Sequence, residues 1–145
     1  KPFVGICLGL QLLFDSSEEF GDYSGLGLIK GRVKKFKFHS HNSTKYPVPQ
    51  IGWNKIKRMD ASWEDSLLCN NTNDDFMYFV HSYFVEPEND NIMLSKTIYG
   101  NTEYCSSIQQ NNIFACQFHP EKSGEIGINI YKNLISKAHQ SNNEE

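Results

Sequence analysis

The chain has 145 residues and a formal net charge of −3. Hydrophobic residues make up 39% of it, and aromatic residues make up 13%. This length suits one domain or a large part of one, and the apolar content is enough to form a buried core. The mild negative charge argues against binding to nucleic acid or to an anionic membrane, and no apolar run approaches the ~20 residues that cross a bilayer.

The first predicted element is a short apolar strand over residues 3–6, typical of a strand that is buried on both faces. A helix is predicted next, because Leu10, Leu13 and Phe14 recur at the i, i+3, i+4 spacing of one helical face. Residues 15–27 are polar and contain several glycines, so we expect them to end this helix and form a loop.

Strand patterns dominate the middle of the chain. Two candidate strands, 28–36 and 51–57, flank a loop over 39–49 that contains two prolines. A short helix is predicted over 62–68. The strongest strand signal is 76–85, which is dense in aromatic and β-branched residues.

Three more strands are predicted over 92–99, 104–109 and 113–118, and a final helix over 125–138. The helix is expected to bury one face, made of Ile128, Tyr131, Leu134 and Ile135. Strand–helix units at both ends, with strands between them, indicate an α/β sandwich whose central strands include a smaller antiparallel set folded against the main sheet. A basic stretch, Lys30–Lys37, is interpreted as a solvated strand edge.

Cys7 is the first candidate for chemistry, because it lies between glycines at positions 5 and 9 where the first strand meets the first helix. A nucleophile in such a sharp turn needs very small neighbours two residues away. The helix would lower the pKa of the thiol, and the backbone N–H of Leu8 would point toward a developing oxyanion. The alternative is a small buried side chain in a glycine-rich turn.

A second candidate group, Gln-Phe-His-Pro-Glu, follows a predicted strand and precedes the final helix. His119 is suited to take the proton from Cys7, and Glu121 is close enough to orient the imidazole. Pro120 fixes the backbone between them. A lone His before Pro is more often structural. Two groups that both fit one Cys-His-carboxylate site, each at the end of a strand, favour a catalytic triad.

The other histidines and cysteines give weaker signals. His39 and His41 lie in a loop without a Cys or carboxylate cluster, so solvent exposure is favoured and no metal site is predicted. His81 has two interpretations that the sequence favours about equally, a histidine buried in the core and a residue with a role beside the site. The four cysteines form no Cys-x-x-Cys pair, so neither disulfides nor zinc are predicted, and a reducing cytoplasm is expected.

These motifs resemble a known family. Residues 5–11 (GICLGLQ) and 117–123 (QFHPEKS) are similar to the two signatures of class I glutamine amidotransferases, and the resemblance runs over essentially the whole chain. It implies a flavodoxin-like three-layer α/β sandwich with a central, mostly parallel sheet and a small antiparallel sheet. It also implies that Cys7, His119 and Glu121 hydrolyse L-glutamine to glutamate and ammonia without a cofactor.

The resemblance implies further roles. The positions that hold the substrate glutamine in the family match Gln11, Glu19, Ser82 and Tyr83, with Glu19 taking the ammonium. One acidic side chain with several hydrogen-bonding groups suits a ligand that carries both an ammonium and a carboxylate. The positions at the contact with a partner protein match Trp53, Asn54 and Lys122.

Segments 12–19, 52–54 and 78–83 are similar to the glutaminase subunits of imidazole glycerol phosphate synthases, which pass ammonia to a (β/α)₈-barrel cyclase in histidine biosynthesis. The alternatives are the same chemistry serving nucleotide-sugar amination for surface polysaccharides, a free-standing γ-glutamyl hydrolase, and a non-catalytic interaction module. Because family chains begin with a Rossmann-like half that supplies a second oxyanion donor, residues 1–145 are expected to form the C-terminal part of one such domain and to turn over little alone.

Overall fold

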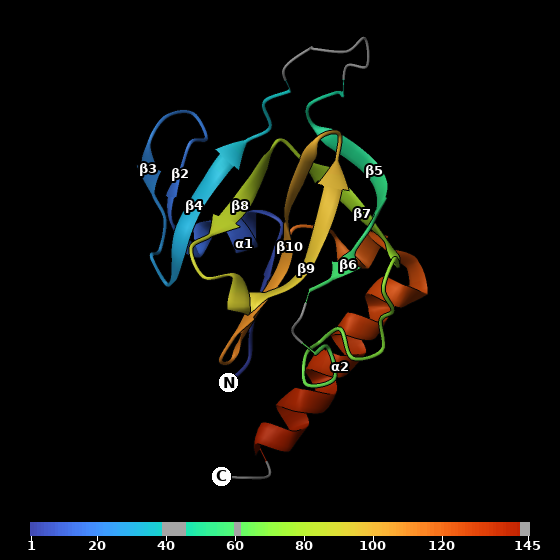
Figure 1. Ribbon diagram of the computed structural model, residues 1–145. Coiled ribbons are helices and arrows are strands. Elements are labelled where there is room, and N and C mark those ends of the chain that lie inside the picture. The colour runs from blue at the N-terminus through green and yellow to red at the C-terminus, as the bar shows by residue number, and fades with distance from the viewer. Residues whose placement is uncertain (39–45, 60–61, 143–145) are drawn as a thin grey trace.

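The structure, a computed structural model, describes residues 1–38, 46–59 and 62–142 (Figure 1). Its helices are α1 (Leu8–Leu12), α2 (Gly124–Asn142) and the short 3₁₀ helices η1 (Asp90–Ile92) and η2 (Pro120–Lys122). Its strands are β1 (Phe3–Ile6), β2 (Phe14–Ser17), β3 (Tyr23–Ser24), β4 (Ile29–Lys35), β5 (Gln50–Lys55), β6 (Lys57–Arg58), β7 (Phe76–His81), β8 (Tyr83–Pro87), β9 (Met93–Tyr99), β10 (Thr102–Gln110) and β11 (Ile113–Cys116).

The main sheet follows the order β1-β11-β10-β8-β4-β2-β3, with β9 paired to β10 and β6 to β9. Within the described residues the pairs β1–β11 and β2–β4 are parallel and the others antiparallel, so the sheet is mixed instead of mostly parallel. The reason is local: two-residue connections return β9 to β10 and β10 to β11, which forces antiparallel pairing. The small antiparallel sheet is confirmed as the pair β5–β7.

The main sheet separates two apolar cores. Along β10 and β11, Tyr104 and Phe114 face one core, whereas Cys105 and Ala115 face the other, as the two-residue period of a strand requires. The first core also receives side chains from β7 and α2, and the second receives side chains from α1 and β2. The result is three layers, with α1 on one face of the sheet and α2 and the β5–β7 sheet on the other (Figure 1).

The helix predicted after the first strand is shorter than expected. It ends at Leu12, and Phe14 begins β2 instead of continuing the helical face. The carbonyl of Leu13 accepts hydrogen bonds from the backbone N–H groups of Leu28 and Ile29, both at 3.0 Å. Pairing with β4 therefore overrides the helical spacing, and part of the segment predicted as a loop becomes β2 and β3.

The aromatic run over 76–85, predicted as one strand, forms two strands in different sheets. The break lies at Ser82, whose carbonyl accepts a hydrogen bond from the Phe36 N–H at 3.1 Å. β7 pairs with β5 before the break, and β8 pairs with β4 after it. The segment thereby ties the small sheet to the main sheet.

The final helix is confirmed, but its buried face differs from the predicted one. Ile130 is buried in the first core, whereas Ile128 and Ile135 are exposed. Gly127 sets this orientation, because a Cβ there would lie 2.1 Å from the carbonyl oxygen of Pro120. The side of α2 that carries Gly127 therefore packs against η2. This orientation turns the face predicted to be buried partly to solvent.

Residues 62–68 form turns and not the predicted helix. Trp63 and Leu68 are nevertheless buried in the first core, and the Trp63 indole N–H donates to the Leu94 carbonyl at 2.7 Å. The Ser66 hydroxyl donates to the Trp63 carbonyl at 2.8 Å. Such local side-chain bonds compete with the helical pattern and favour turns.

The basic stretch lies in β4, which is an interior strand and not an edge. Ile29 and Val33 are buried, while the charged residues between them point outward. Arg32 and Lys34 reach Glu86 of β8 at 3.1 and 2.8 Å. The stretch is therefore a solvated face with surface ion pairs, which contribute little to stability.

Phe79 tests the packing of the first core. Its ring is fully buried and meets the Phe118 ring edge-on, with centroids 5.8 Å apart. Phe79→Ala should lower the free energy of unfolding by about 3–5 kcal/mol in urea denaturation, because it leaves a cavity. Phe20→Ala is the matched control, since that ring is 90% exposed. Equal losses for both variants would contradict this assignment of the core.

Candidate active site

Cys7 lies at a sharp turn between β1 and α1. Its φ is +53°, a left-handed conformation that residues other than glycine rarely adopt. A Cβ on Gly5 would lie 2.9 Å from the backbone of Gly9, so the turn requires glycine at position 5. A Cβ on Gly9 would meet no described atom within 4 Å, so the predicted need for tiny neighbours holds at Gly5 only. The strand–turn–helix geometry is that of a nucleophile elbow.

The parallel pairing of β1 with β11 determines what lies beside this turn. Ile6 is opposite Cys116, and the Cys7 N–H donates to the Cys116 carbonyl at 2.8 Å. Parallel strands end at the same edge of a sheet, so the segment after β11 runs next to the Cys7 turn. This segment carries Gln117, whose Nε2 lies 3.6 Å from the Cys7 Sγ, and then His119.

His119 and Glu121 are brought together, with 2.7 Å between the His119 Nδ1 and the Glu121 Oε1. An ionised carboxylate only accepts hydrogen bonds, so Nδ1 carries the hydrogen and Nε2 of the neutral ring is an acceptor. This Nε2 is buried and has no hydrogen-bond partner in the described part of the chain. The imidazole is therefore held with a free nitrogen that can receive a proton, although no hydrogen bond joins it to Cys7 among the described residues.

Burial raises the pKa of the Cys7 thiol above its ordinary value, which corrects the expectation of a lowered pKa. The Leu8 backbone N–H and the Gln117 side chain lower this pKa, and the charges of Glu121 and Glu19 raise it. The helix α1 has only five residues, and the loss of solvation outweighs the partial charge at its end. Cys7 is thus a thiol near neutral pH and needs a base to become a nucleophile.

A cavity of about 560 Å³ opens beside the Cys7 turn. Its lining includes Gln11 and Glu19, two of the four positions matched to substrate binding, but not Ser82 or Tyr83. Tyr83 contributes through its backbone, because its carbonyl accepts a hydrogen bond from the Gln11 Nε2 at 3.1 Å. The remaining lining is made of Leu8, Leu12, Ser17, Phe20, Tyr23, Ser24 and Gly25.

His81 is a buried core histidine that shares a hydrogen-bond acceptor, the Tyr83 carbonyl, with Gln11. Its Nδ1 is 2.7 Å from the Tyr83 carbonyl oxygen, and its Nε2 is 3.2 Å from the Tyr104 hydroxyl. Burial lowers the pKa of His81 to about 4, so the ring is neutral near pH 7 and donates its Nδ1–H to the carbonyl. Of the two interpretations that the sequence left open, the core position is observed, and it adjoins the site.

Ser123 is a structural part of the site to which the sequence assigned no role. Its hydroxyl donates to the His119 carbonyl at 2.6 Å and accepts from the Tyr78 N–H at 2.9 Å. The His119 N–H donates in turn to the Tyr78 carbonyl at 2.9 Å. These bonds fasten the histidine segment to β7. A serine two residues before a predicted helix was the available signal.

The three positions matched to a partner contact lie on or near the β5–β7 sheet. The exposed Trp53 meets the Tyr78 ring edge-on at 6.0 Å between centroids, and the Lys122 Nζ lies 5.8 Å from the centroid of that ring. Asn54 is held within the fold, since its Nδ2 donates to the Ile98 carbonyl at 2.8 Å. Trp53 and Lys122 therefore meet over Tyr78, while Asn54 links β5 to β9.

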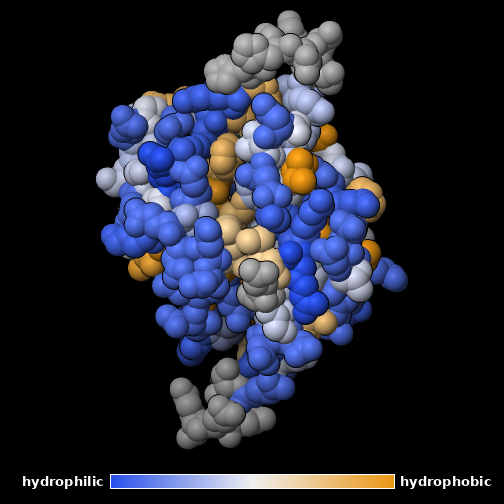
Figure 2. Space-filling model, in the orientation of Figure 1, coloured by the Kyte–Doolittle hydropathy of each residue, from blue (hydrophilic) through white to orange (hydrophobic). Residues whose placement is uncertain are grey.

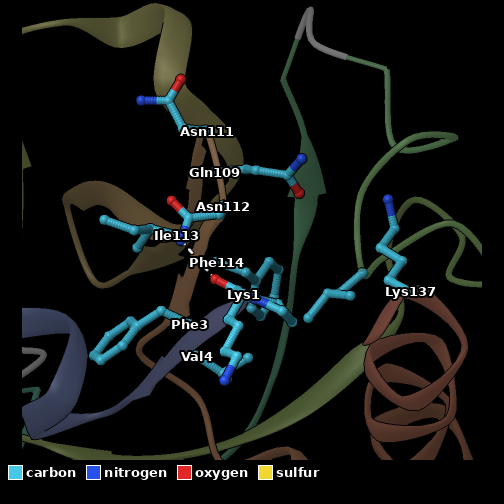
Figure 3. A pocket seen from close by; sticks show the side chains of 11 residues that line it. Lys1, Phe3, Val4, Gln109, Asn111, Asn112, Ile113, Phe114 and Lys137 are labelled. Carbon is cyan, nitrogen blue, oxygen red and sulfur yellow. Dashed lines mark hydrogen bonds between the residues drawn. The ribbon is translucent and has the colours of Figure 1, made fainter. Parts of the chain in front are cut away.

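Two other cavities lie away from Cys7. One, of about 190 Å³, is at the opposite end of β1, where the Asn112 side chain donates to the Lys1 carbonyl at 2.6 Å (Figure 3). The other, of about 340 Å³, is lined by residues of β8, β9 and β10. The face in Figure 2 is largely hydrophilic, with an apolar strip near its middle. Neither Cys7 nor His119 lines any of the three cavities, and the 560 Å³ cavity reaches the Cys7 turn through Leu8.

Across residues 1–38, 46–59 and 62–142, no group of three or more His, Cys, Asp or Glu side chains is placed to hold a metal ion. His39 and His41 lie outside these ranges. No helix in the same part of the chain is long and apolar enough to cross a membrane.

The sequence matches the family described as "Glutamine amidotransferase class-I" over residues 1–138. The "Imidazole glycerol phosphate synthase subunit HisH 1" of Legionella pneumophila (strain Lens) is 39% identical, over 93% of this chain and 64% of that protein. The subunit HisH of Chlorobium chlorochromatii (strain CaD3) is 43% identical, over 90% of this chain and 61% of that protein. The chain thus spans about three-fifths of the length of these relatives.

Solved structures show the same fold at low sequence identity. A Thermoplasma acidophilum protein named after GMP synthase has a TM-score of 0.64 at 19% identity, over 99% of this chain and 61% of that one. The glutaminase domain of Trypanosoma brucei CTPS has a TM-score of 0.58 at 15% identity, over 93% of this chain and 60% of that one. These likenesses confirm the fold class predicted from the sequence, with the mixed sheet described above.

The buried His81 predicts how stability depends on pH. The folded protein keeps this ring neutral down to about pH 4, whereas the unfolded chain takes up a proton below about 6.5. The stabilising contribution is therefore present above pH 6.5 and is lost as the pH falls toward 4. Between pH 7 and pH 5, His81 should account for a loss of about 2 kcal/mol in the free energy of unfolding.

Urea denaturation at the two pH values measures this loss. His81→Gln should make the decrease smaller by about that amount, whereas His139→Gln, at an exposed position of α2, should leave it unchanged. An identical pH dependence in the wild type and His81→Gln would refute the assignment.

Proposed function

Because this chain belongs to the class I glutamine amidotransferase family, we propose that the protein hydrolyses L-glutamine to glutamate and ammonia with Cys7, His119 and Glu121. One observation carries the proposal. A half-buried imidazole, bound to a carboxylate through Nδ1 and with a buried Nε2 that has no partner among the described residues, lies on the segment beside a cysteine in a strained turn. The arrangement combines a nucleophile, a base and a group that orients the base.

In the proposed reaction, the Cys7 Sγ attacks the carbon of the side-chain amide as His119 Nε2 removes the thiol proton. The tetrahedral intermediate collapses, the C–N bond breaks, and His119 returns the proton to the departing ammonia. Water then hydrolyses the glutamyl thioester and releases glutamate. The raised pKa of the Cys7 thiol suits this sequence, because the nucleophile depends on the base. The Leu8 N–H supplies one oxyanion donor.

The cavity beside Cys7 is the proposed glutamine site. Both hydrogens of the Gln11 amide are used, one toward the Tyr83 carbonyl and one toward Gln117, so its Oε1 remains to accept from a ligand. This oxygen and the Glu19 carboxylate suit the α-ammonium of glutamine. Ser82 and Tyr83 are proposed to complete the site from the junction of β7 and β8.

The relatives named imidazole glycerol phosphate synthase subunit HisH favour one destination for the ammonia. We propose delivery to a (β/α)₈-barrel cyclase subunit in histidine biosynthesis, with this protein as the glutaminase half of a heterodimer. None of the residues described above favours the alternative, nucleotide-sugar amination. We also propose a cytoplasmic location for the protein, since a cysteine nucleophile must remain reduced.

The proposed partner surface is the outer face of the β5–β7 sheet. Ile51 and Trp53 of β5 and Phe76 of β7 share this face and are exposed, and Tyr78 lies between them. Grouped apolar and aromatic side chains on a surface are typical of a protein interface. The Tyr78 carbonyl is bonded to the His119 N–H, so the surface adjoins the proposed triad.

The nucleophile is tested by glutamate release from the full-length protein with its barrel partner. Cys7→Ala should reduce the rate by about 10⁴-fold or more, because the covalent route is lost. Cys69→Ala is the matched control, since Cys69 is exposed and unbonded to another cysteine, and it should retain the wild-type rate. Glutamate release that survives Cys7→Ala would exclude the proposed reaction.

The partner surface is tested by calorimetric titration with the barrel protein. Trp53→Ala should weaken binding by about 10-fold to 30-fold, the range of an aromatic hot spot worth about 1.4–2 kcal/mol. Ile135→Ala provides the comparison, because this side chain is equally exposed but lies on α2. Similar affinities for both variants would place the interface elsewhere.

A further inference from the structure

We propose that Gln117 is a further catalytic residue, whose side-chain amide donates a hydrogen bond to the Cys7 sulfur and is held in that orientation by Gln11. The inference rests on the proposed function, in which Cys7 is the nucleophile. It assigns a role to a residue that the sequence presents only as part of a motif.

The geometry places Gln117 between Gln11 and Cys7. The Gln117 side chain is completely buried, and its backbone N–H is anchored to the Ser106 carbonyl at 2.9 Å. Its Nε2 lies 3.6 Å from the Cys7 Sγ, and its Oε1 lies 3.1 Å from the Gln11 Nε2. Both ends of the amide therefore have a partner, as a buried amide requires.

The direction of these hydrogen bonds is fixed by a backbone group. The Tyr83 carbonyl oxygen can only accept, so the Gln11 atom that faces it at 3.1 Å must be the amide nitrogen. The same nitrogen faces Gln117, which must then present its oxygen. The nitrogen of Gln117 is left on the side of Cys7. Rotating either amide by 180° would set two donors or two acceptors against each other.

His81 reinforces this direction at the far end. Its neutral ring donates Nδ1–H to the same Tyr83 carbonyl at 2.7 Å, so that oxygen accepts from both His81 and Gln11. The donors therefore run from Gln11 through Gln117 to the sulfur, and the Tyr83 carbonyl that fixes the Gln11 amide is itself held by His81. Gln11 is accordingly a positioning residue for Gln117.

The proposed role follows from what happens to the sulfur during the reaction. When the Cys7 proton moves to His119, negative charge develops on a sulfur that burial has removed from most of its water. An N–H donor that already points at this atom stabilises the thiolate more than the thiol. Gln117 thus opposes the effect of burial from within the site, together with the Leu8 N–H.

The test measures the pKa of Cys7 in the full-length protein by the pH dependence of iodoacetamide alkylation, followed for each cysteine by mass spectrometry. Gln117→Met removes the donor at similar side-chain length, and Gln117→Asn keeps the amide but withdraws it by one methylene. Each should raise the pKa of Cys7 by about one unit, the shift expected for a lost bond to a charged group. Alkylation at pH 7 should slow only about 3-fold, because a thiolate of higher pKa is more nucleophilic.

Cys69 is the internal control, because it is exposed and its alkylation should not change. Circular dichroism identifies a variant that fails to fold. If Gln117→Met does not fold, the Gln117→Asn variant carries the test. An unchanged pKa of Cys7 in a folded variant would overturn the inference and leave Gln117 as packing. The proposed function fails separately, through glutamate release by Cys7→Ala, and that failure would leave the alkylation result intact.

Discussion

The parallel pairing of β1 with β11 is the interaction on which the proposed site depends. It joins residues more than one hundred positions apart, and it aligns the end of β1 with the end of β11 to within a single residue, Ile6 opposite Cys116. A slip of β11 by one residue would turn its side chains to the opposite faces of the sheet and carry Ala115 to the wrong core. It would also separate Cys7 from Gln117. The same hydrogen bonds therefore hold the central core together and set the distances at the proposed nucleophile.

The site balances two opposing consequences of burial. Removal from water raises the pKa of the Cys7 thiol, which keeps the sulfur protonated near neutral pH, and it lowers the pKa of His81, which keeps that ring neutral. The neutral ring can then serve as a fixed donor to the Tyr83 carbonyl. A low-dielectric setting also strengthens each hydrogen bond in the chain that ends at the sulfur. The polar chain is thus costly to bury, and it gives the site a single geometry.

The small β5–β7 sheet gives this site an outer surface. Its strand β7 is fastened to the segment of His119 by two hydrogen bonds of Tyr78, and a third bond, from Ser123 to the His119 carbonyl, lies within that segment. A movement of Tyr78 on its exposed side therefore reaches the backbone of His119 without an intervening loop. The aromatic contact with Trp53 and the position of Lys122 above the same ring place apolar and charged contacts around that point. This arrangement gives the proposed partner a short physical route to the triad.

Much of the fold and the centre of the candidate site could be predicted from the sequence, because the signals are local. The local signals are Gly5 before Cys7, the proline between His119 and Glu121, and the aromatic density of 76–85, and each reports a backbone requirement of a few residues. Pairing partners and burial are not local. The break of one aromatic run into two strands, the early end of α1 and the mixed direction of the sheet each depend on strands elsewhere in the chain. The raised pKa of the Cys7 thiol and the orientation of Gln117 were decided by tertiary structure alone, because desolvation and hydrogen-bond direction depend on what surrounds a group in space.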